Sequence, residues 1–221
     1  MTSQEQWNST KIYEHDTFKG IVVDDDQNLY FTNDEGFWRF SNNKHISHIL
    51  YTTSSGIALH ERKIYICQGS RILLFDLATN ITEVFFGIPR DQQDSEEVDG
   101  ANPHIVAPDD YTHQLNRIVV NTSSEMYFTT KCSLHKINLL DKSVQLVAGD
   151  PKKPGYQDGS LSDAKFERIT GMTSTPDGIL YISDNKRLRK VKDGVVSTFI
   201  TPHPDEEMKD GSLSEATFAF A

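Results

Sequence analysis

Four segments of the chain repeat one pattern of apolar and polar positions around a tyrosine. In each segment Leu, Ile or Met stands directly before the tyrosine, Phe or Ile follows it, and a small residue comes next. An apolar residue returns ten positions after the tyrosine in every copy. Because the spacing downstream of each anchor holds without gaps, the pattern predicts four copies of one structural unit. The anchors are Tyr30, Tyr65, Tyr127 and Tyr181.

Each unit is predicted to be a four-stranded antiparallel meander. A short apolar run precedes the tyrosine run, and the two are separated by the turn-forming clusters DDDQN, HERK, NTSS and TPDG. Runs rich in Val, Ile, Phe and Tyr between such clusters are typical of strands joined by tight turns. A further apolar run completes each unit, at residues 45–50, 81–86, 143–148 and 195–200. No stretch shows sustained helical periodicity, so the predicted class is all-β.

The predicted packing of the units follows from strands that are apolar on consecutive positions. Runs such as RILLF and LYFT do not alternate with polar residues, which indicates that both faces of the sheet are buried. Four-stranded sheets stacked radially bury both faces, and that arrangement is a β-propeller. A β-sandwich is the alternative, but it gives no reason for a hairpin register repeated four times. The predicted blades span 19–55, 56–90, 116–149 and 171–204.

A motif in the C-terminal part of the chain occurs twice. DGSLSDAKF at 158–166 returns as DGSLSEATF at 210–218, with seven identities in nine positions. With its surroundings from 147 to 201, this motif resembles the NHL repeat, in the subtype that has AG…GYxDG…AxF before the strands. The resemblance marks six residues as structural anchors of the repeat: Asp158, Gly159, Phe166, Asp210, Gly211 and Phe218.

The resemblance implies a propeller, most often one of six blades. The chain supplies four blades, and 205–221 is expected to start a truncated fifth blade. Residues 1–18 are expected to be an N-terminal extension or a closing strand, 91–115 an acidic loop between blades, and 150–170 the connector that carries the DG…AxF motif. An open ring exposes sheet edges and apolar blade faces, so self-association is a further expectation.

Composition narrows the classes of partner. Lys and Arg total 22 against 32 Asp and Glu, for a formal net charge of -10, which repels DNA and anionic membranes. No run approaches the roughly 18 to 20 apolar residues of a membrane span. The first residues lack the basic and apolar regions of a secretory signal, so a cytoplasmic location is expected. Cys67 and Cys132 are the only cysteines, which excludes a disulfide framework.

An enzyme is one alternative function, because some propellers are metal-dependent lactonases or hydrolases that use Ca²⁺ or Zn²⁺. Asp24, Asp25 and Asp26 offer clustered oxygens for Ca²⁺, but they align with the turns of the other units, where Asp is favoured for turn chemistry alone. The histidines and cysteines show no zinc-binding spacing. The prediction is therefore a protein without catalytic residues, metal or cofactor.

Binding of single-stranded RNA is the third alternative. NKRLRKVK at 185–192 carries five cations in eight positions, and some NHL propellers bind RNA on a basic face. The other units do not extend this patch at the equivalent positions. RNA recognition needs several convergent cations, so a solvated strand edge is the preferred interpretation of this run.

The predicted function is a non-catalytic scaffold that binds another protein. Loops on a rigid scaffold are common sites of partner contact, and the loops at 33–36, 68–70, 131–133 and 185–187 occupy the same place in their units. They are therefore expected to cluster on one rim, with the acidic loop as a further contact. The predicted binding residues are Asn33, Asp34, Glu35, Gln68, Ser70, Lys131, Asn185, Lys186 and Arg187.

Overall fold

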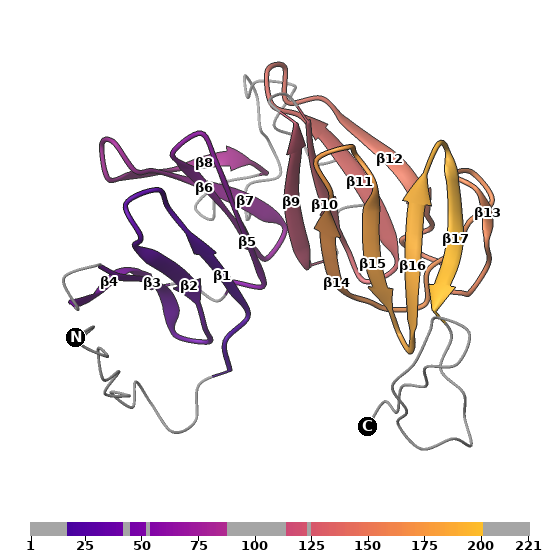
Figure 1. Ribbon diagram of the computed structural model, residues 1–221, viewed down its shortest axis with the longest axis horizontal. Helices are drawn as coiled ribbons and strands as arrows, with labels where there is room; N and C mark the ends of the chain where they lie inside the picture. Colours follow the sequence, from indigo (N-terminus) through magenta and orange to yellow (C-terminus); the bar gives the residue numbers. More distant parts are fainter. Residues whose placement is uncertain (1–16, 42–44, 52–53, 88–113, 123–124, 201–221) are drawn as a thin grey trace, which may run out of the picture.

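The described residues form an all-β propeller of four blades, each built on four antiparallel strands. The computed structural model describes residues 17–41, 45–51, 54–87, 114–122 and 125–200. Residues 1–16, most of the predicted acidic loop and the predicted fifth blade, with Asp210, Gly211 and Phe218, lie outside the described residues. Figure 1 shows the blades in chain order.

The strands of each blade pair in chain order, from the first to the fourth. Blade 1 comprises β1 (Gly20–Val23), β2 (Leu29–Thr32), β3 (Gly36–Phe40) and β4 (Ile46–Tyr51). Blade 2 comprises β5 (Gly56–His60), β6 (Lys63–Gln68), β7 (Arg71–Asp76) and β8 (Ile81–Phe86). Blade 3 comprises β9 (Arg117–Thr122), β10 (Glu125–Thr129), β11 (Ser133–Asn138) and β12 (Val144–Gly149).

Blade 4 has one strand more than the others. It comprises β14 (Ile169–Ser174), β15 (Leu180–Asp184), β16 (Arg187–Lys192) and β17 (Val195–Ile200). The short strand β13 (Gly159–Ser160) pairs with β17 at the outer edge. The segment predicted as a connector, 150–170, therefore contains β13 and the first two residues of β14. Its backbone pairs with β17 through β13 and with β15 through β14.

The four tyrosines occupy matched positions on the second strand of their blades. Each lies opposite the fourth residue of the third strand of its blade: Arg39, Leu74, Lys136 and Lys190. Tyr30 and Tyr65 are buried between their own blade and the next one, and Tyr127 packs partly buried against blade 4. Tyr181 alternates with the buried Leu180 and Ile182, so it points to the face of blade 4 away from blade 3.

In the part of the chain that the structure describes, the hydrophobic core consists of three clusters, one at each junction between adjacent blades. Phe37, Ile64 and Phe75 belong to the cluster between blades 1 and 2. Blade 2 also contributes Tyr65 and Leu74 to the cluster that it shares with blade 3. Successive residues of one strand thus enter different clusters, which explains the consecutive apolar positions in RILLF.

The first strands β1, β5, β9 and β14 contact one another in chain order and line the axis of the propeller. They begin at the same end of the blades, because Asn116, directly before β9, donates from Nδ2 to Ile169 O at the start of β14. The loops between second and third strands lie at that end as well. We call it the proximal face; the opposite end, with the turns between first and second strands, is the distal face.

Candidate functional site

Hydrogen bonds connect the loops of the proximal face to the starts of first strands. Leu115 N donates to Gly69 O over 2.8 Å, which ties the blade 2 loop to the segment that leads into β9. Ile169 N donates to Lys131 O over 2.7 Å, which ties the blade 3 loop to β14. The loops and the axial strands therefore form one continuous surface.

The nine predicted binding residues all belong to this face, but they differ in exposure. Asp34, Glu35, Lys131 and Lys186 are exposed, and Ser70, Asn185 and Arg187 are partly buried. Asn33 and Gln68 are buried. Asn33 Oδ1 accepts from the Glu35 and Gly36 amides and from Trp38 Nε1, so this side chain shapes its own turn.

A pocket of about 670 Å³ opens on the proximal face and takes residues from every blade or from the segment that leads into it. Its volume lies within the range of about 300 to 1,000 Å³ that is usual for ligand pockets. Two aliphatic residues, Leu115 and Ile169, contribute to its wall. The remaining lining is polar or cationic: Ser55, Gln114, Asn116, Thr170, Lys19, Arg117, Lys131 and Arg168.

Arg117 is held rigidly in the wall of this pocket. Its Nη1 donates to Ser55 O over 2.7 Å, to Asn116 Oδ1 over 2.8 Å and to Asn116 O over 3.0 Å. Burial lowers the pKa of the Arg117 guanidinium from its ordinary value. The cation is thus fixed in orientation and partly removed from water.

The other three cations differ in their surroundings. Lys19 forms an ion pair with Asp34. Lys131 and Arg168 are exposed, and no described residue accepts a hydrogen bond from either side chain. Of the four, the loop pattern in the sequence predicts only Lys131 as a binding residue. The missed signal is that a cation stands at or directly before the start of the first strand in three blades, as Lys19, Arg117 and Arg168.

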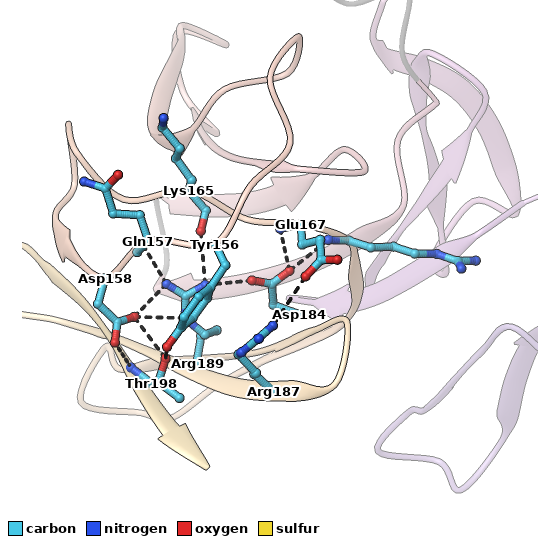
Figure 2. A network of polar contacts seen from close by, with 10 residues as sticks. Tyr156, Gln157, Asp158, Lys165, Glu167, Asp184, Arg187, Arg189 and Thr198 are labelled. Atoms are coloured by element: carbon cyan, nitrogen blue, oxygen red, sulfur yellow. Dashed lines mark hydrogen bonds and ion pairs between the residues drawn. The ribbon is translucent and has the colours of Figure 1, made fainter. Parts of the chain in front are cut away.

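The DG…F motif forms a polar network around the buried Arg189 in blade 4 (Figure 2). The Arg189 side chain has no exposed surface. Its Nη1 lies 2.7 Å from Asp184 Oδ2, and its Nη2 lies 2.7 Å from Asp158 Oδ1. Carbonyl oxygens of Gln157 and Lys165 accept from the same guanidinium. The network fastens 157–165 to the edge of blade 4.

This network corrects the interpretation of 185–192 as a solvated strand edge. Arg189 is buried, because two carboxylates compensate its charge. Arg187 lies over the Tyr156 ring at 4.0 Å and pairs with Glu167 at 3.3 Å. Lys186 and Lys192 are exposed at opposite ends of β16. The five cations of this run therefore do not form one basic surface.

The positions three and eight residues after the anchor tyrosine form a polar pair in more than one blade. In blade 4 they are Asp184 and Arg189, and in blade 1 they are Asn33 and Trp38, bonded at 2.9 Å. In blade 3 the residue at the later position is His135, whose Nε2 lies 2.7 Å from Ser133 Oγ. Burial lowers the pKa of His135 to about 4, so it is neutral near neutral pH.

The residues considered for metal or thiol chemistry have local structural contacts. Asp24 accepts hydrogen bonds from Asn28 and Tyr30, which lower its pKa although burial opposes the shift. Burial raises the pKa of Cys67 to about 12, and it also raises the pKa of Cys132. Among the described residues, no three His, Cys, Asp or Glu side chains are grouped to hold a metal ion.

The described part of the chain contains no helix long and apolar enough to cross a membrane.

Solved structures with a similar fold come from several proteins. One is a protein of unknown function from Bacteroides thetaiotaomicron, with a TM-score of 0.66 and 22% identity over 90% of this chain and 52% of its own. An auxiliary nutrient binding protein from the same organism has a TM-score of 0.63 and 16% identity, covering 83% of this chain and 47% of its own. A catalytically inactive virginiamycin B lyase from Staphylococcus aureus, with quinupristin, has a TM-score of 0.57 and 14% identity, covering 86% of this chain and 57% of its own.

These similarities establish the class of protein, a β-propeller, and the chain spans about half the length of the three solved chains. No protein-family model matches the chain, and no curated protein matches its sequence.

Proposed function

We propose that this chain is a non-catalytic binding propeller that holds a partner protein at its proximal face. The observation that carries the proposal is the pocket on that face, to which all four blades or their leading segments contribute. The cationic, amide and hydroxyl side chains of this pocket suit the binding and orientation of a partner, because they form hydrogen bonds. They do not accept a proton near neutral pH, so they are unsuited to act as a catalytic base.

Two further points support the proposal. The auxiliary nutrient binding protein with the same fold is, by its description, a binding protein. Lys131 lines the pocket, and Glu35 and Lys186 are exposed on other loops of the same face, which the sheets hold in place. Rigid loops lose little conformational entropy on binding, so they favour affinity.

We also propose that blade 4 is of the NHL type, on the residues that carry its resemblance. Asp158 and Phe166, two anchors of the DG…AxF motif, contact Arg189 of the third strand of the blade, as an ion pair and as a ring lying 5.2 Å from the guanidinium carbon. These two contacts hold the motif against the third strand, and they support a structural role for the motif in this blade.

Photo-crosslinking tests the proposed binding face. A photoreactive amino acid replaces Glu35, Lys131 or Lys186 on the proximal face, and Glu61, Asp177 or Asp193 on the distal face. In cells that express the protein, the proximal positions are expected to yield one defined adduct, and the distal positions are expected to yield none. Adducts of equal intensity from both faces, or from the distal face alone, would contradict the proposal.

A metal-dependent hydrolase or lyase is the second candidate, favoured by the lyase among the proteins with a similar fold. Metal analysis of the purified protein decides between the two. Stoichiometric Ca²⁺ or Zn²⁺ that resists dialysis would support the enzyme and count against a purely binding function.

A further inference from the structure

The proximal pocket concentrates positive charge in an acidic molecule. The chain carries a formal net charge of -10, yet four of the residues around this pocket are Lys or Arg and none of its described lining residues is Asp or Glu. Asp34 offsets Lys19. The charges of Arg117, Lys131 and Arg168 have no carboxylate partner among the described residues.

Arg117 is arranged to accept an anion. Its Nη1 is satisfied by three protein oxygens, whereas no described residue accepts from its Nε or Nη2. A guanidinium held in this way offers its planar fork to a carboxylate without further loss of side-chain freedom. Burial already lowers the pKa of Arg117, and a bound anion would offset that desolvation.

We infer that this pocket binds the carboxylates of an acidic peptide segment, an inference that rests on the proposed function and names the chemistry of the partner. Arg117 holds one carboxylate at the wall, and the exposed Lys131 and Arg168 hold its neighbours along the segment. Gln114 and Thr170, both exposed at the rim, provide hydrogen-bonding groups for the peptide backbone.

Single-stranded RNA fits the same pocket less well. Base recognition relies on aromatic side chains as stacking platforms, and no aromatic residue is among the described residues that line the pocket. The negative net charge of the whole molecule also repels a long phosphate backbone more strongly than a short acidic segment, because the longer ligand carries more negative charges.

Fluorescence anisotropy with a labelled poly-glutamate peptide tests this inference on the full chain. The pocket variant carries Lys131→Glu and Arg168→Glu, two exposed positions whose side chains bond to no described residue. The control variant carries Lys63→Glu and Lys192→Glu, two exposed positions on the distal face. Both variants change the net charge equally, so general repulsion affects them alike.

The wild type is expected to bind the peptide, with an affinity that falls as salt rises. The pocket variant is expected to lose about tenfold in affinity and the control less than about twofold, since each tenfold step corresponds to about 1.4 kcal/mol. Equal losses in both variants, or no binding by the wild type at low salt, would overturn the inference. Tighter binding of labelled poly-uridylate, lost in the pocket variant alone, would assign the pocket to RNA and overturn it as well.

The two proposals fail in different ways. Proximal crosslinks without poly-glutamate binding would leave the binding face standing and reject the acidic segment. Poly-glutamate binding that only the pocket variant loses, with crosslinks confined to the distal face, would keep the anion pocket and reject the proximal face as the site of the partner protein.

Discussion

Arg189 illustrates at the scale of a residue how a charge is kept inside this fold. A buried cation is tolerated when carboxylates and carbonyls satisfy its donors, and Arg189 has Asp158 and Asp184 as well as two backbone oxygens. Asp184 is itself fully buried and also accepts from the Glu167 and Arg168 amides. Loss of the guanidinium would leave that carboxylate uncompensated.

Arg189→Met is therefore expected to lower the free energy of unfolding by about 3 to 5 kcal/mol, the cost of breaking a buried ion pair from one side. Adding Asp184→Asn is expected to restore part of the loss, because the amide keeps an acceptor for the two N–H groups and removes the unpaired charge. Urea denaturation measures both values. A loss under about 1 kcal/mol for the single variant would show that the network does not stabilise the blade.

The sequence pattern revealed some of these residues and not their roles. The repeated DG…F motif marks Asp158 and Phe166, whereas the run of cations wrongly predicts a solvated Arg189. A run of cations in the sequence contains no sign of which side chain is buried, because the compensating Asp158 lies 31 positions away in the chain. Arg117 was missed for the same reason: its partner Ser55 is 62 positions away.

At the scale of an element, the axial strands approach one another so closely that a side chain is excluded at one point. A Cβ atom added to Gly56, the first residue of β5, would lie 2.8 Å from Asn116 O and 3.1 Å from Arg117 Cα. Both contacts are with backbone, which cannot move aside as a side chain can. The close spacing of β5 and β9 thus depends on this glycine. The position of Arg117, at the start of β9, depends on it as well.

Gly56→Ala is expected to cost about 1 to 3 kcal/mol of stability, as overpacking does elsewhere, and to weaken poly-glutamate binding because Arg117 is displaced. Gly155→Ala is the matched control, since its nearest neighbour is the flexible Lys165 side chain at 3.4 Å. Thermal unfolding and anisotropy measure the two effects. An equally stable Gly56→Ala protein would mean that the axial strands separate without cost.

At the scale of the whole molecule, the end blades expose apolar side chains on their outer faces. Val22 packs partly buried between blades 1 and 2, so its neighbours Ile21 and Val23 point away from blade 2 and are 65% and 50% exposed. On blade 4, Phe199 is 41% exposed and contacts Tyr181 edge-on. Exposed apolar faces of this kind favour association with another chain.

We expect the protein to self-associate through these faces. Ile21→Glu combined with Phe199→Glu is expected to weaken association by at least about tenfold, because each buried apolar side chain contributes about 1.5 to 3 kcal/mol. Sedimentation velocity over a range of concentrations measures the change. Ile81→Glu is the control, since Ile81 is 60% exposed at the start of β8 on the outer strand of blade 2. An equal effect of the control would contradict association through the end faces.

The repeat, the strands and the stacking of blades can all be predicted from the order of residues along the chain. These features depend on short apolar runs and on the turns between them, which recur in each unit around Tyr30, Tyr65, Tyr127 and Tyr181. It also placed the loops that form the proximal face. The similarity among the units can therefore be recognised in the sequence, because it arises from residues that are close together along the chain.

Which side chains meet, in contrast, depends on how distant segments pack in the folded protein. Lys19, Arg117, Lys131 and Arg168 come from separate segments and share one pocket because the first strands lie side by side around the axis. The burial of Arg189 likewise depends on a motif folded back from outside the four-stranded unit. Charge and burial at these sites result from contacts between distant segments, which no local pattern encodes.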